Sequence, residues 1–320
     1  MNEQSPAYEL KHLKEWIEKS PPNDPLAVLS VFGDPVKHSL SPQMHNPALK
    51  ICGINGEYIK IRVPEENFTE ALGLIRELGF HGTNCTIPLK FAALNACNHI
   101  DMAAQRMGAV NTISFENDKI IGSNSDGPGL VRAIREEFSI DIRDLRVMIL
   151  GAGGGAGRAV AIQCAMEKVE RLVLVNRTKD KAEKIASEIE PDFLDDNIHR
   201  DSSRLKVSEW SNTELANEIG NIDLIINASP IGMNSSDPDL IPQNILEPHH
   251  LVYDMIYSPS KTKLIRDAKS IGARTANGLS MLLHQGAISF ETWFNQEAPI
   301  DAMKKGLDEA IQKLKTYIYS

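Results

Sequence analysis

The residues with the clearest chemical meaning are the glycines of the stretch Gly-Ala-Gly-Gly-Gly-Ala-Gly at 151–157. A backbone without side chains can turn tightly and let phosphate oxygens approach its N–H groups. An apolar run at 146–150 leads into the stretch, a helical pattern follows it, and a second apolar run occupies 171–175. A strand, a glycine turn, a helix and a second strand hold the pyrophosphate of a dinucleotide at the helix N-terminus. The alternative is a glycine-rich turn that binds no ligand. We expect a dinucleotide to contact Gly151, Ala152, Gly153, Gly154, Gly155 and Ala156.

The residues after the second apolar run indicate which dinucleotide would bind. A site for NAD places Asp or Glu at this strand end to hold the ribose 2′-hydroxyl. The chain instead continues Asn176-Arg177-Thr178, with Lys179 and Lys181 close behind. A guanidinium group matches the geometry and charge of a 2′-phosphate, so the sequence favours NADP over NAD. A solvated basic start of the next helix is the alternative, and it leaves the missing acid unexplained.

Several polar side chains follow predicted strands in the N-terminal half. Asn84, Thr86 and Lys90 lie in one stretch, and Asn111 lies in a second one. Ligand contacts in α/β sheets gather at strand ends and turns, so these residues are candidates for a binding site.

Two further candidates have an ordinary structural explanation. Ser39 and Ser41 follow the predicted strand 27–32 and can face one pocket if the segment stays extended. Ser41 followed by Pro42 is also typical of a helix start. Asp126 opens a predicted helix, where an aspartate commonly caps the N-terminus. On these residues alone, the capping explanation is favoured at both places.

The elements that must position these residues follow an α/β pattern. The apolar runs 27–32 and 58–63 predict strands, and the second precedes an amphipathic helix. Residues 1–26 contain a short helical pattern ended by prolines, and we interpret them as an N-terminal extension. The apolar side chains of the amphipathic helix have the spacing of one stripe and are Phe68, Ala71, Leu72, Ile75 and Leu78.

Composition limits the class of protein. The 320 residues suffice for two domains, and 42% hydrophobic with 24% charged residues are ordinary for a globular chain. A net charge of −9 argues against nucleic acid or an anionic membrane as a partner. No apolar run approaches the roughly 18 residues of a membrane span. Scattered cysteines without metal-binding spacing predict a cytoplasmic protein that holds no metal.

Taken together, the motifs resemble the shikimate dehydrogenase family, which includes shikimate/quinate dehydrogenases. The resemblance covers residues 27–295, with the motifs in order and at plausible spacing. It is carried by the glycine loop, by Asn176-Arg177-Thr178 and by the stretches His38–Pro42, Asn84–Lys90, Gly108–Thr112, Gly122–Gly127, Ile225–Met233, Tyr253–Tyr257 and Gly278–Ala287.

The resemblance implies an α/β fold of two domains with the active-site cleft between them. One is an N-terminal α/β substrate-binding domain, spanning 27–125 and completed by 278–320. The other is a Rossmann-type, doubly wound NADP-binding domain spanning 126–277. The implied activity is the reversible, NADPH-dependent reduction of 3-dehydroshikimate to shikimate, a step of chorismate and aromatic amino acid biosynthesis.

The same resemblance implies roles for the matching residues. Lys90 and Asp126 match the catalytic pair, and Ser39 and Ser41 match the pair that holds the substrate carboxylate. Met281 matches a residue packed near the nicotinamide. The implied ligands of the ring hydroxyls are Asn84, Thr86, Asn111 and Gln285, with Tyr257 nearby. The implied clamp on the 2′-phosphate consists of Arg177 and Thr178, with Asn176 beside them and Lys181 in a supporting place.

Some departures from the family pattern matter. The family loop usually reads Gly-Ala-Gly-Gly-Ala, so this chain has one extra glycine, and where the helix begins stays open. Asn124-Ser125-Asp126 replaces the usual Asn-Thr-Asp and keeps a hydroxyl. Asn84-Cys85-Thr86 replaces Asn-Val-Thr, and we expect Cys85 to point into the core because alternate strand residues face opposite ways.

The chemistry leaves some questions open. Ketone reduction needs a proton at the developing alkoxide, and a lysine can donate it or hold the oxygen electrostatically. Which of Lys90 and Asp126 moves the proton is not decided, nor is the choice between monomer and homodimer. One alternative is a quinate/shikimate dehydrogenase that uses NAD or NADP; Arg177 counts against NAD. The other is a non-catalytic NADP-binding regulator of the same fold, against which the intact Lys90 and Asp126 count.

Overall fold

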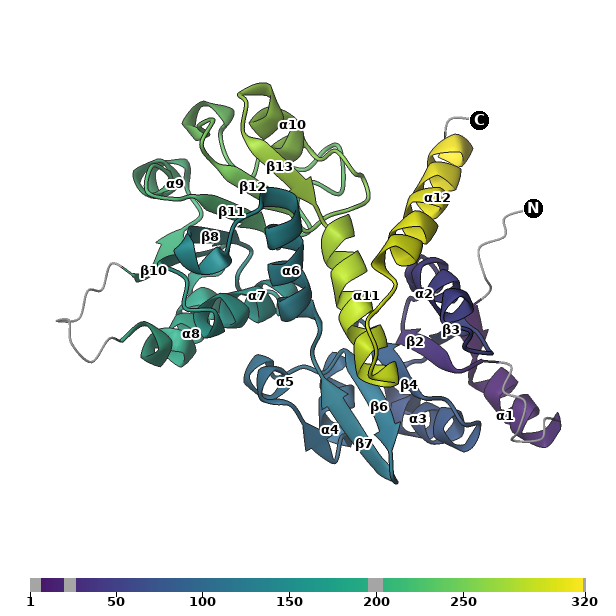
Figure 1. The fold of residues 1–320 in the computed structure, drawn as a ribbon. Helices are drawn as coiled ribbons and strands as arrows, with labels where there is room; N and C mark the ends of the chain where they lie inside the picture. The colour runs from purple at the N-terminus through teal and green to yellow at the C-terminus, as the bar shows by residue number, and fades with distance from the viewer. Residues whose placement is uncertain (1–6, 20–26, 195–203, 319–320) are drawn as a thin grey trace. The chain divides into compact units, whose positions relative to one another are not determined.

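The computed structural model describes residues 7–19, 27–194 and 204–318, and these form two compact units. The first unit consists of the described residues up to Ser125 together with those from Leu283 onwards. The second unit runs from Asp126 to Leu282. Helix α11 (Leu279–Phe294) begins in the second unit and ends in the first (Figure 1).

The first unit contains a mixed sheet whose strand order in the described residues is β1-β3-β2-β4-β6-β7-β5. The pairs β1–β3, β3–β2, β2–β4 and β5–β7 are parallel, whereas β4–β6 and β6–β7 are antiparallel. The strands are β1 Ala7–Glu9, β2 Leu29–Gly33, β3 Tyr58–Arg62, β4 Gly82–Cys85, β5 His99–Ile100, β6 Thr112–Glu116 and β7 Lys119–Ser123.

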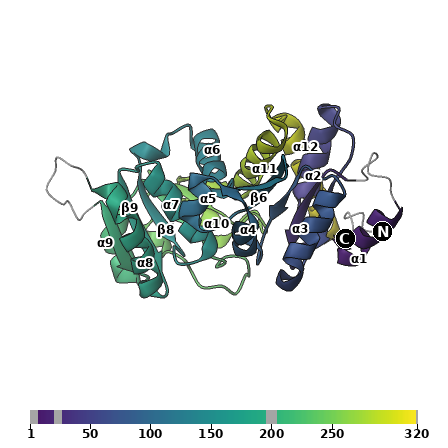
Figure 2. The ribbon, with the colours of Figure 1, turned by 90° about the horizontal axis from the view of Figure 1, so that it is seen from below.

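Helices pack on this sheet through the predicted apolar positions. Phe68, Ala71, Leu72 and Ile75 are buried as the stripe predicts, and so is Cys85. Helix α12 lies beside α2 in both ribbon views (Figure 1, Figure 2), and Gly306 permits this because a Cβ there would lie 2.1 Å from the Gln43 carbonyl oxygen. The helices are α1 Leu10–Lys19, α2 Ser41–Ile51, α3 Phe68–Glu77, α4 Lys90–Ala96, α5 Met102–Met107 and α12 Ile300–Ile318, with a 3-10 turn at Glu65–Asn67.

The described part of the N-terminal segment is built into the first unit. The sequence pattern predicts an extension over residues 1–26, but 7–9 form β1, which pairs in parallel with β3 at Ala7↔Lys60. Helix α1 follows at once and packs on α3, with Leu13 fully buried. A strand this short has no sequence signal of its own, because only its partner strand defines it. The rest of the predicted extension lies outside the described residues.

The second unit contains a parallel sheet with the order β10-β9-β8-β11-β12-β13. The chain leaves β8 towards β9 on one side and returns to β11 on the other, which creates a topological switch point beside β8. The expected doubly wound α/β fold is confirmed. The strands are β8 Arg146–Leu150, β9 Arg171–Asn176, β10 Leu205–Glu209, β11 Leu224–Asn227, β12 Leu251–Asp254 and β13 Arg274–Asn277. The helices are α6 Asp126–Phe138, α7 Gly155–Met166, α8 Lys179–Ile189, α9 Asn212–Ile219 and α10 Lys263–Ser270, with 3-10 turns at Ile142–Asp144, Glu190–Phe193 and Gln243–Ile245.

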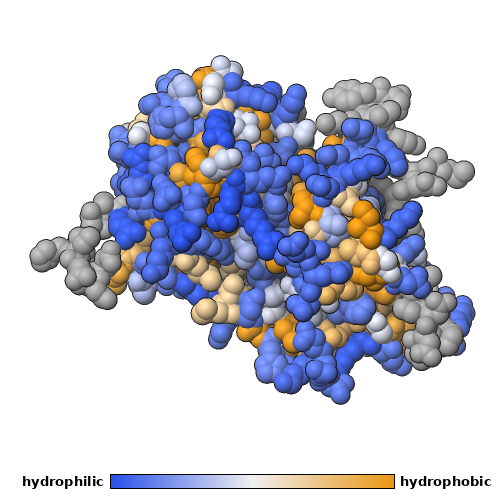
Figure 3. Space-filling view, in the orientation of Figure 1, coloured by the Kyte–Doolittle hydropathy of each residue, from blue (hydrophilic) through white to orange (hydrophobic). Residues whose placement is uncertain are grey.

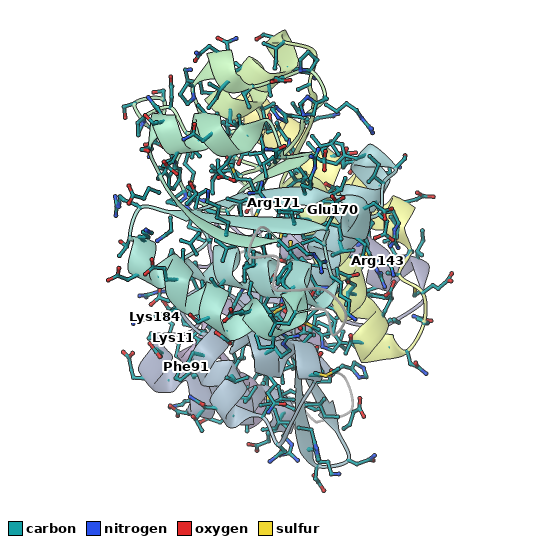
Figure 4. The ribbon with its side chains drawn as sticks, turned by 90° about the vertical axis from the view of Figure 1, so that its left-hand side faces the viewer. Lys11, Phe91, Arg143, Glu170, Arg171 and Lys184 are labelled. Carbon is teal, nitrogen blue, oxygen red and sulfur yellow. The ribbon has the colours of Figure 1, made fainter. Side chains whose placement is uncertain are left out.

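An ion cluster fastens α9 to the edge of this sheet. Arg171, labelled in Figure 4, begins β9 and donates through Nη2 to Oε2 of Glu218 at 2.6 Å. Lys206 of β10 pairs with the same carboxylate. Burial raises the pKa of Glu218, but the hydrogen bonds from Lys206 and Arg171 outweigh burial and leave the pKa below its ordinary value.

Hydrophilic residues predominate on the face of the molecule shown in Figure 3. No helix in the described ranges combines the length and apolar character that a membrane crossing demands.

Candidate active site

The glycine turn follows β8 and leads into α7. The N–H groups of Gly151 and Ala152 donate to the Val175 carbonyl of β9 at 2.8 and 3.1 Å, so the turn starts against the adjacent strand. Gly151 has a φ of +86°, a conformation that L side chains rarely adopt. A Cβ on Gly157 would lie 2.2 Å from the Gly151 carbonyl oxygen, so the first turn of α7 packs directly on the glycine turn.

The extra glycine lies at the start of helix α7. The structure thereby shows where the helix after the glycine loop begins, which the sequence left open. Gly154 precedes the helix and Gly155 is its first residue. A Cβ on Gly155 would meet no atom within 4 Å, so the space beside it is open. The first N–H groups of a helix lack intrahelical acceptors and favour an anion. The loop therefore offers donors and room, which fits a pyrophosphate.

Asn176 ties the glycine loop to the turn that follows β9. Its Oδ1 accepts from Gly153 N at 3.2 Å, and its Nδ2 donates to the Thr178 carbonyl at 2.8 Å. A Cβ on Gly153 would lie 2.5 Å from Asn176 Nδ2, so glycine is required for this contact. Arg177, Thr178 and Lys181 are exposed beside the turn.

A carboxylate that the sequence pattern did not indicate lies near this turn. Glu209 ends β10 in register with Asn176. Its Oε1 lies 3.8 Å from the Lys179 ammonium, so a neighbouring cation offsets its charge. Sequence spacing gave no hint of it, because β10 lies far along the chain and only the sheet brings it beside β9.

Buried polar side chains order the loops after β11 and β12. Asn227 Nδ2 donates to Asp254 Oδ1 at 3.0 Å, and Thr262 Oγ1 donates to Asp254 Oδ2 at 2.6 Å. Burial raises the pKa of Asp254, although these hydrogen bonds act against it. Ser229 follows β11 and lies against the glycine turn, because a Cβ on Gly151 would be 2.8 Å from the Ser229 Cβ. Loops from both sides of the switch point therefore border the same turn.

Tyr257 and Met281 lie in the second unit. Met281 N donates to the Tyr253 hydroxyl at 3.0 Å, which fixes the start of α11 against β12. Burial raises the pKa of Tyr257, so its phenol stays protonated at neutral pH.

Asp126 is the first residue of α6 and directly follows Ser125, the last residue of the first unit before the chain crosses over.

The two predicted serines face each other in the first unit. Ser39 Oγ donates to Ser41 Oγ at 3.1 Å, and Ser41 N donates to Ser39 Oγ at 3.3 Å. Ser41 is the first residue of α2, and the N-cap position is Leu40. The capping explanation favoured by the sequence is therefore wrong for Ser41, whose hydroxyl accepts from Ser39.

Asn84 and Asn111 belong to one buried hydrogen-bond network. Asn84 Nδ2 donates to the Asn111 carbonyl, to Thr112 Oγ1 and to Ser289 Oγ at 3.0–3.1 Å. Asn111 Oδ1 accepts from Ser125 N at 2.9 Å. Asn84 is only 6% exposed, so its amide holds β4, β6 and α11 together.

The network also contains Thr112, Ser125 and Ser289, which the sequence pattern did not single out. Thr112 Oγ1 and Ser289 Oγ are 2.8 Å apart, and Ser125 Oγ lies 3.2 Å from Ser289 Oγ. Ser289 is fully buried and lies one helical turn after Gln285, whose carbonyl accepts its hydroxyl proton at 3.0 Å. That spacing of four residues on one helix face was the available signal.

Tyr58 also belongs to this network, and the sequence pattern did not single it out. Its hydroxyl donates to Asn84 Oδ1 at 2.8 Å. Burial raises the pKa of Tyr58, and a hydrogen bond with Ser41 acts in the opposite direction. The ring stacks on His45, with centroids 4.3 Å apart and an angle of 6° between the planes. Burial lowers the pKa of His45 to about 3, so the imidazole is neutral and packs as a flat surface.

Thr86, Lys90 and Gln285 complete the first unit's candidates. Thr86 N donates to the Phe32 carbonyl at 2.9 Å, which holds the segment after β4 beside the end of β2. Lys90 is half-buried and begins α4, and its carbonyl accepts from Val110 N at 3.0 Å. Gln285 is half-buried on α11. The first unit thus gathers the predicted residues that follow β2 and β4, while the cofactor residues lie in the second.

The close packing at the glycine turn can be tested by paired substitutions. Gly157→Ala would place a Cβ 2.2 Å from a carbonyl oxygen, so we expect a loss of about 1–3 kcal/mol in the free energy of unfolding. Gly155→Ala is the matched control, because its Cβ meets no atom within 4 Å. Thermal and urea melts of both variants measure the difference. Equal stability of the two variants would contradict the packing.

Family models match three stretches of the chain. The shikimate dehydrogenase substrate binding domain matches residues 31–113. The model described as shikimate / quinate 5-dehydrogenase matches residues 132–229. The shikimate 5'-dehydrogenase C-terminal domain matches residues 278–305.

Whole-chain relatives agree with these matches. The shikimate dehydrogenase (NADP(+)) of Methanopyrus kandleri is 38% identical over 287 residues, which cover 89% of this chain and 96% of the relative. A crystal structure of a shikimate dehydrogenase in complex with NADP+ has a TM-score of 0.80 at 37% identity, covering 91% of this chain and 98% of that one. The shikimate 5-dehydrogenase of Thermus thermophilus, in complex with NADP(H) and shikimate, has a TM-score of 0.75 at 32% identity, covering 88% and 98%. On this agreement of family models, sequence and fold, the chain belongs to the shikimate dehydrogenase family.

Proposed function

We propose that this protein is an NADP-dependent shikimate dehydrogenase, which reduces 3-dehydroshikimate to shikimate with NADPH and runs reversibly. The observation that carries the proposal is that a relative named shikimate dehydrogenase (NADP(+)) aligns over 89% of the chain. The exposed Arg177 beside the glycine turn supports the choice of NADP. The biosynthetic role would be in the formation of chorismate and the aromatic amino acids.

The cofactor-binding residues are proposed from the second unit. The glycine turn and the first N–H groups of α7 would hold the pyrophosphate, and Arg177, Thr178 and Lys181 would hold the 2′-phosphate. Asn176 would keep these two parts at a fixed spacing through its bonds to Gly153 and Thr178. Met281 would pack near the nicotinamide, which supplies or accepts the hydride when bound.

The substrate-binding residues are proposed mainly from the first unit. The hydroxyls of Ser39 and Ser41 would donate to the substrate carboxylate, since both can rotate away from each other. The ring hydroxyls would bond to Thr86, Asn111 and Gln285, with Tyr257 nearby. Asn84 is proposed as a further ligand of the ring hydroxyls. Its amide also positions Tyr58 and the main chain at Asn111.

Lys90 and Asp126 are the proposed catalytic residues. As the carbonyl oxygen gains negative charge, the Lys90 ammonium would stabilise it and supply a proton. Asp126 would exchange the proton with Lys90 or with the substrate hydroxyl, so that the two titrate as a unit. Ser125, held by Asn111, fixes the main chain immediately before Asp126.

The activity itself is the first test. We expect the purified protein to reduce NADP when shikimate is added, seen as a rise in absorbance at ~340 nm, and to do so more efficiently than with quinate or with NAD. Assays of each substrate with each cofactor measure this. Absence of turnover with shikimate and NADP would overturn the proposal.

Arg177→Ala tests the cofactor assignment. Loss of a charged hydrogen bond is expected to raise KM for NADP about tenfold to a hundredfold, with little change in KM for shikimate. Lys184→Ala is the matched control, because Lys184 is an exposed cation on α8, the helix that follows the Arg177 turn (Figure 4). Equal shifts of KM for both ligands would show that Arg177 is not the clamp.

Lys90→Ala tests the catalytic assignment. If Lys90 acts on the developing charge, kcat should fall by about 10²–10⁴-fold while KM for shikimate changes little. Asp126→Asn should show a similar defect, and the double variant should be little worse than either single one. Steady-state kinetics with a thermal melt of each variant measures this. A near-normal kcat for Lys90→Ala would remove the assignment.

A further inference from the structure

One face of β3 contacts the loop 34–41, which carries the serine pair, Ser39 and Ser41. Side chains two residues apart on a strand point the same way, so Tyr58, Lys60 and Arg62 share a face. Arg62 Nε donates to Asp34 Oδ1 at 2.8 Å, just after β2. Ser41, at the other end of the loop, acts to lower the pKa of Tyr58 against the effect of burial, so Tyr58 lies close to it. Arg62 therefore holds the start of the loop 34–41, and Tyr58 lies beside its end.

Lys60 holds the middle of the same loop. Its ammonium donates to the Lys37 carbonyl at 3.0 Å, two residues before Ser39. The side chain is 1% exposed, although a buried ammonium costs much more than a buried apolar group. Within the described ranges, no carboxylate forms an ion pair with Lys60. A methionine would fill a similar volume without that cost, so the positive charge itself requires an explanation.

The surroundings of Lys60 suit an anion. Burial lowers the pKa of Lys60, and the nearby charge of Lys37 lowers it further. A carboxylate bound at the serine pair would act in the opposite direction and favour the charged form. The N-terminus of α2 begins at Ser41, so its partial positive charge adds to that of the ammonium. The loop thus has a buried cation against its middle and a helix N-terminus at its end.

We propose that Lys60 is a positioning residue that makes the site selective for a substrate carrying a carboxylate, by placing a buried positive charge behind the loop of Ser39 and Ser41. This inference rests on the proposed function, because the serine pair is assigned to the substrate carboxylate there. Lys60 acts through the loop and through its charge, without touching the substrate.

The test compares a charged with a neutral substrate. Lys60→Met removes both the charge and the donor, Lys60→Gln keeps an N–H donor and removes the charge, and Lys60→Arg keeps the charge. Each variant is assayed with shikimate and with its methyl ester, and the ester is measured as a competitive inhibitor if its turnover is too slow. Lys50→Met, on the exposed last turn of α2, is the control for the change in net charge.

We expect Lys60→Met and Lys60→Gln to raise KM for shikimate about tenfold, with kcat and KM for NADP nearly unchanged. The affinity for the methyl ester should stay near the wild-type value, and Lys60→Arg should restore the preference for shikimate. Lys50→Met should behave as wild type. If Lys60→Met is unfolded at the assay temperature, the comparison is made with Lys60→Gln instead.

Other outcomes overturn the inference. Equal losses for shikimate and its ester would mean that Lys60 only supports the fold of the loop. Unchanged discrimination in a folded Lys60 variant would mean that the charge does not act on the substrate. A wild-type protein inactive with shikimate and NADP would instead overturn the proposed function, so the two failures are distinguishable.

Discussion

Parallel strands bring their carboxyl ends to one edge of a sheet, and the candidate site depends on this constraint. In the first unit β2, β3 and β4 are parallel, so the segments that carry Ser41 and Lys90 leave the sheet at the same edge. Strand β6 is antiparallel to β4 and pairs Thr112 with Asn84, which places Asn111 at that edge as well. Strand β7 then returns the chain to Ser125 there, immediately before Asp126.

The second unit uses the same constraint for the cofactor residues. The glycine turn after β8, the Asn176 turn after β9 and the Ser229 loop after β11 all follow carboxyl ends of adjacent strands. The glycines are fixed by contacts as well as by conformation: Gly157 packs on the Gly151 carbonyl, and Gly153 packs on Asn176. The extra glycine is accommodated because Gly155 has open space beside it.

Grouping polar residues at a buried edge carries an energetic cost, which hydrogen bonds within the edge offset. Asn84 is an example. Its amide bonds to Tyr58, Thr112, Ser289 and the Asn111 carbonyl. A buried amide with these partners holds the neighbouring strands and helix in place, besides any contact that it makes to a substrate.

The sequence by itself determined the features that depend on neighbouring residues. The glycine turn with its flanking strands and the basic Arg177 turn were predictable because local spacing specifies them, and the family resemblance carried by the motifs implied the doubly wound fold. Tertiary structure decided the rest. Asn84 and Ser289 are 205 positions apart, and β1 exists only because β3 pairs with it. In residues 58–62, polar and apolar side chains alternate, a pattern that predicts one solvent-exposed face. Lys60 is nevertheless buried, because the loop 34–41 covers it. The burial of a side chain and its hydrogen-bond partners depend on which elements pack against its segment. Those elements come from distant parts of the chain.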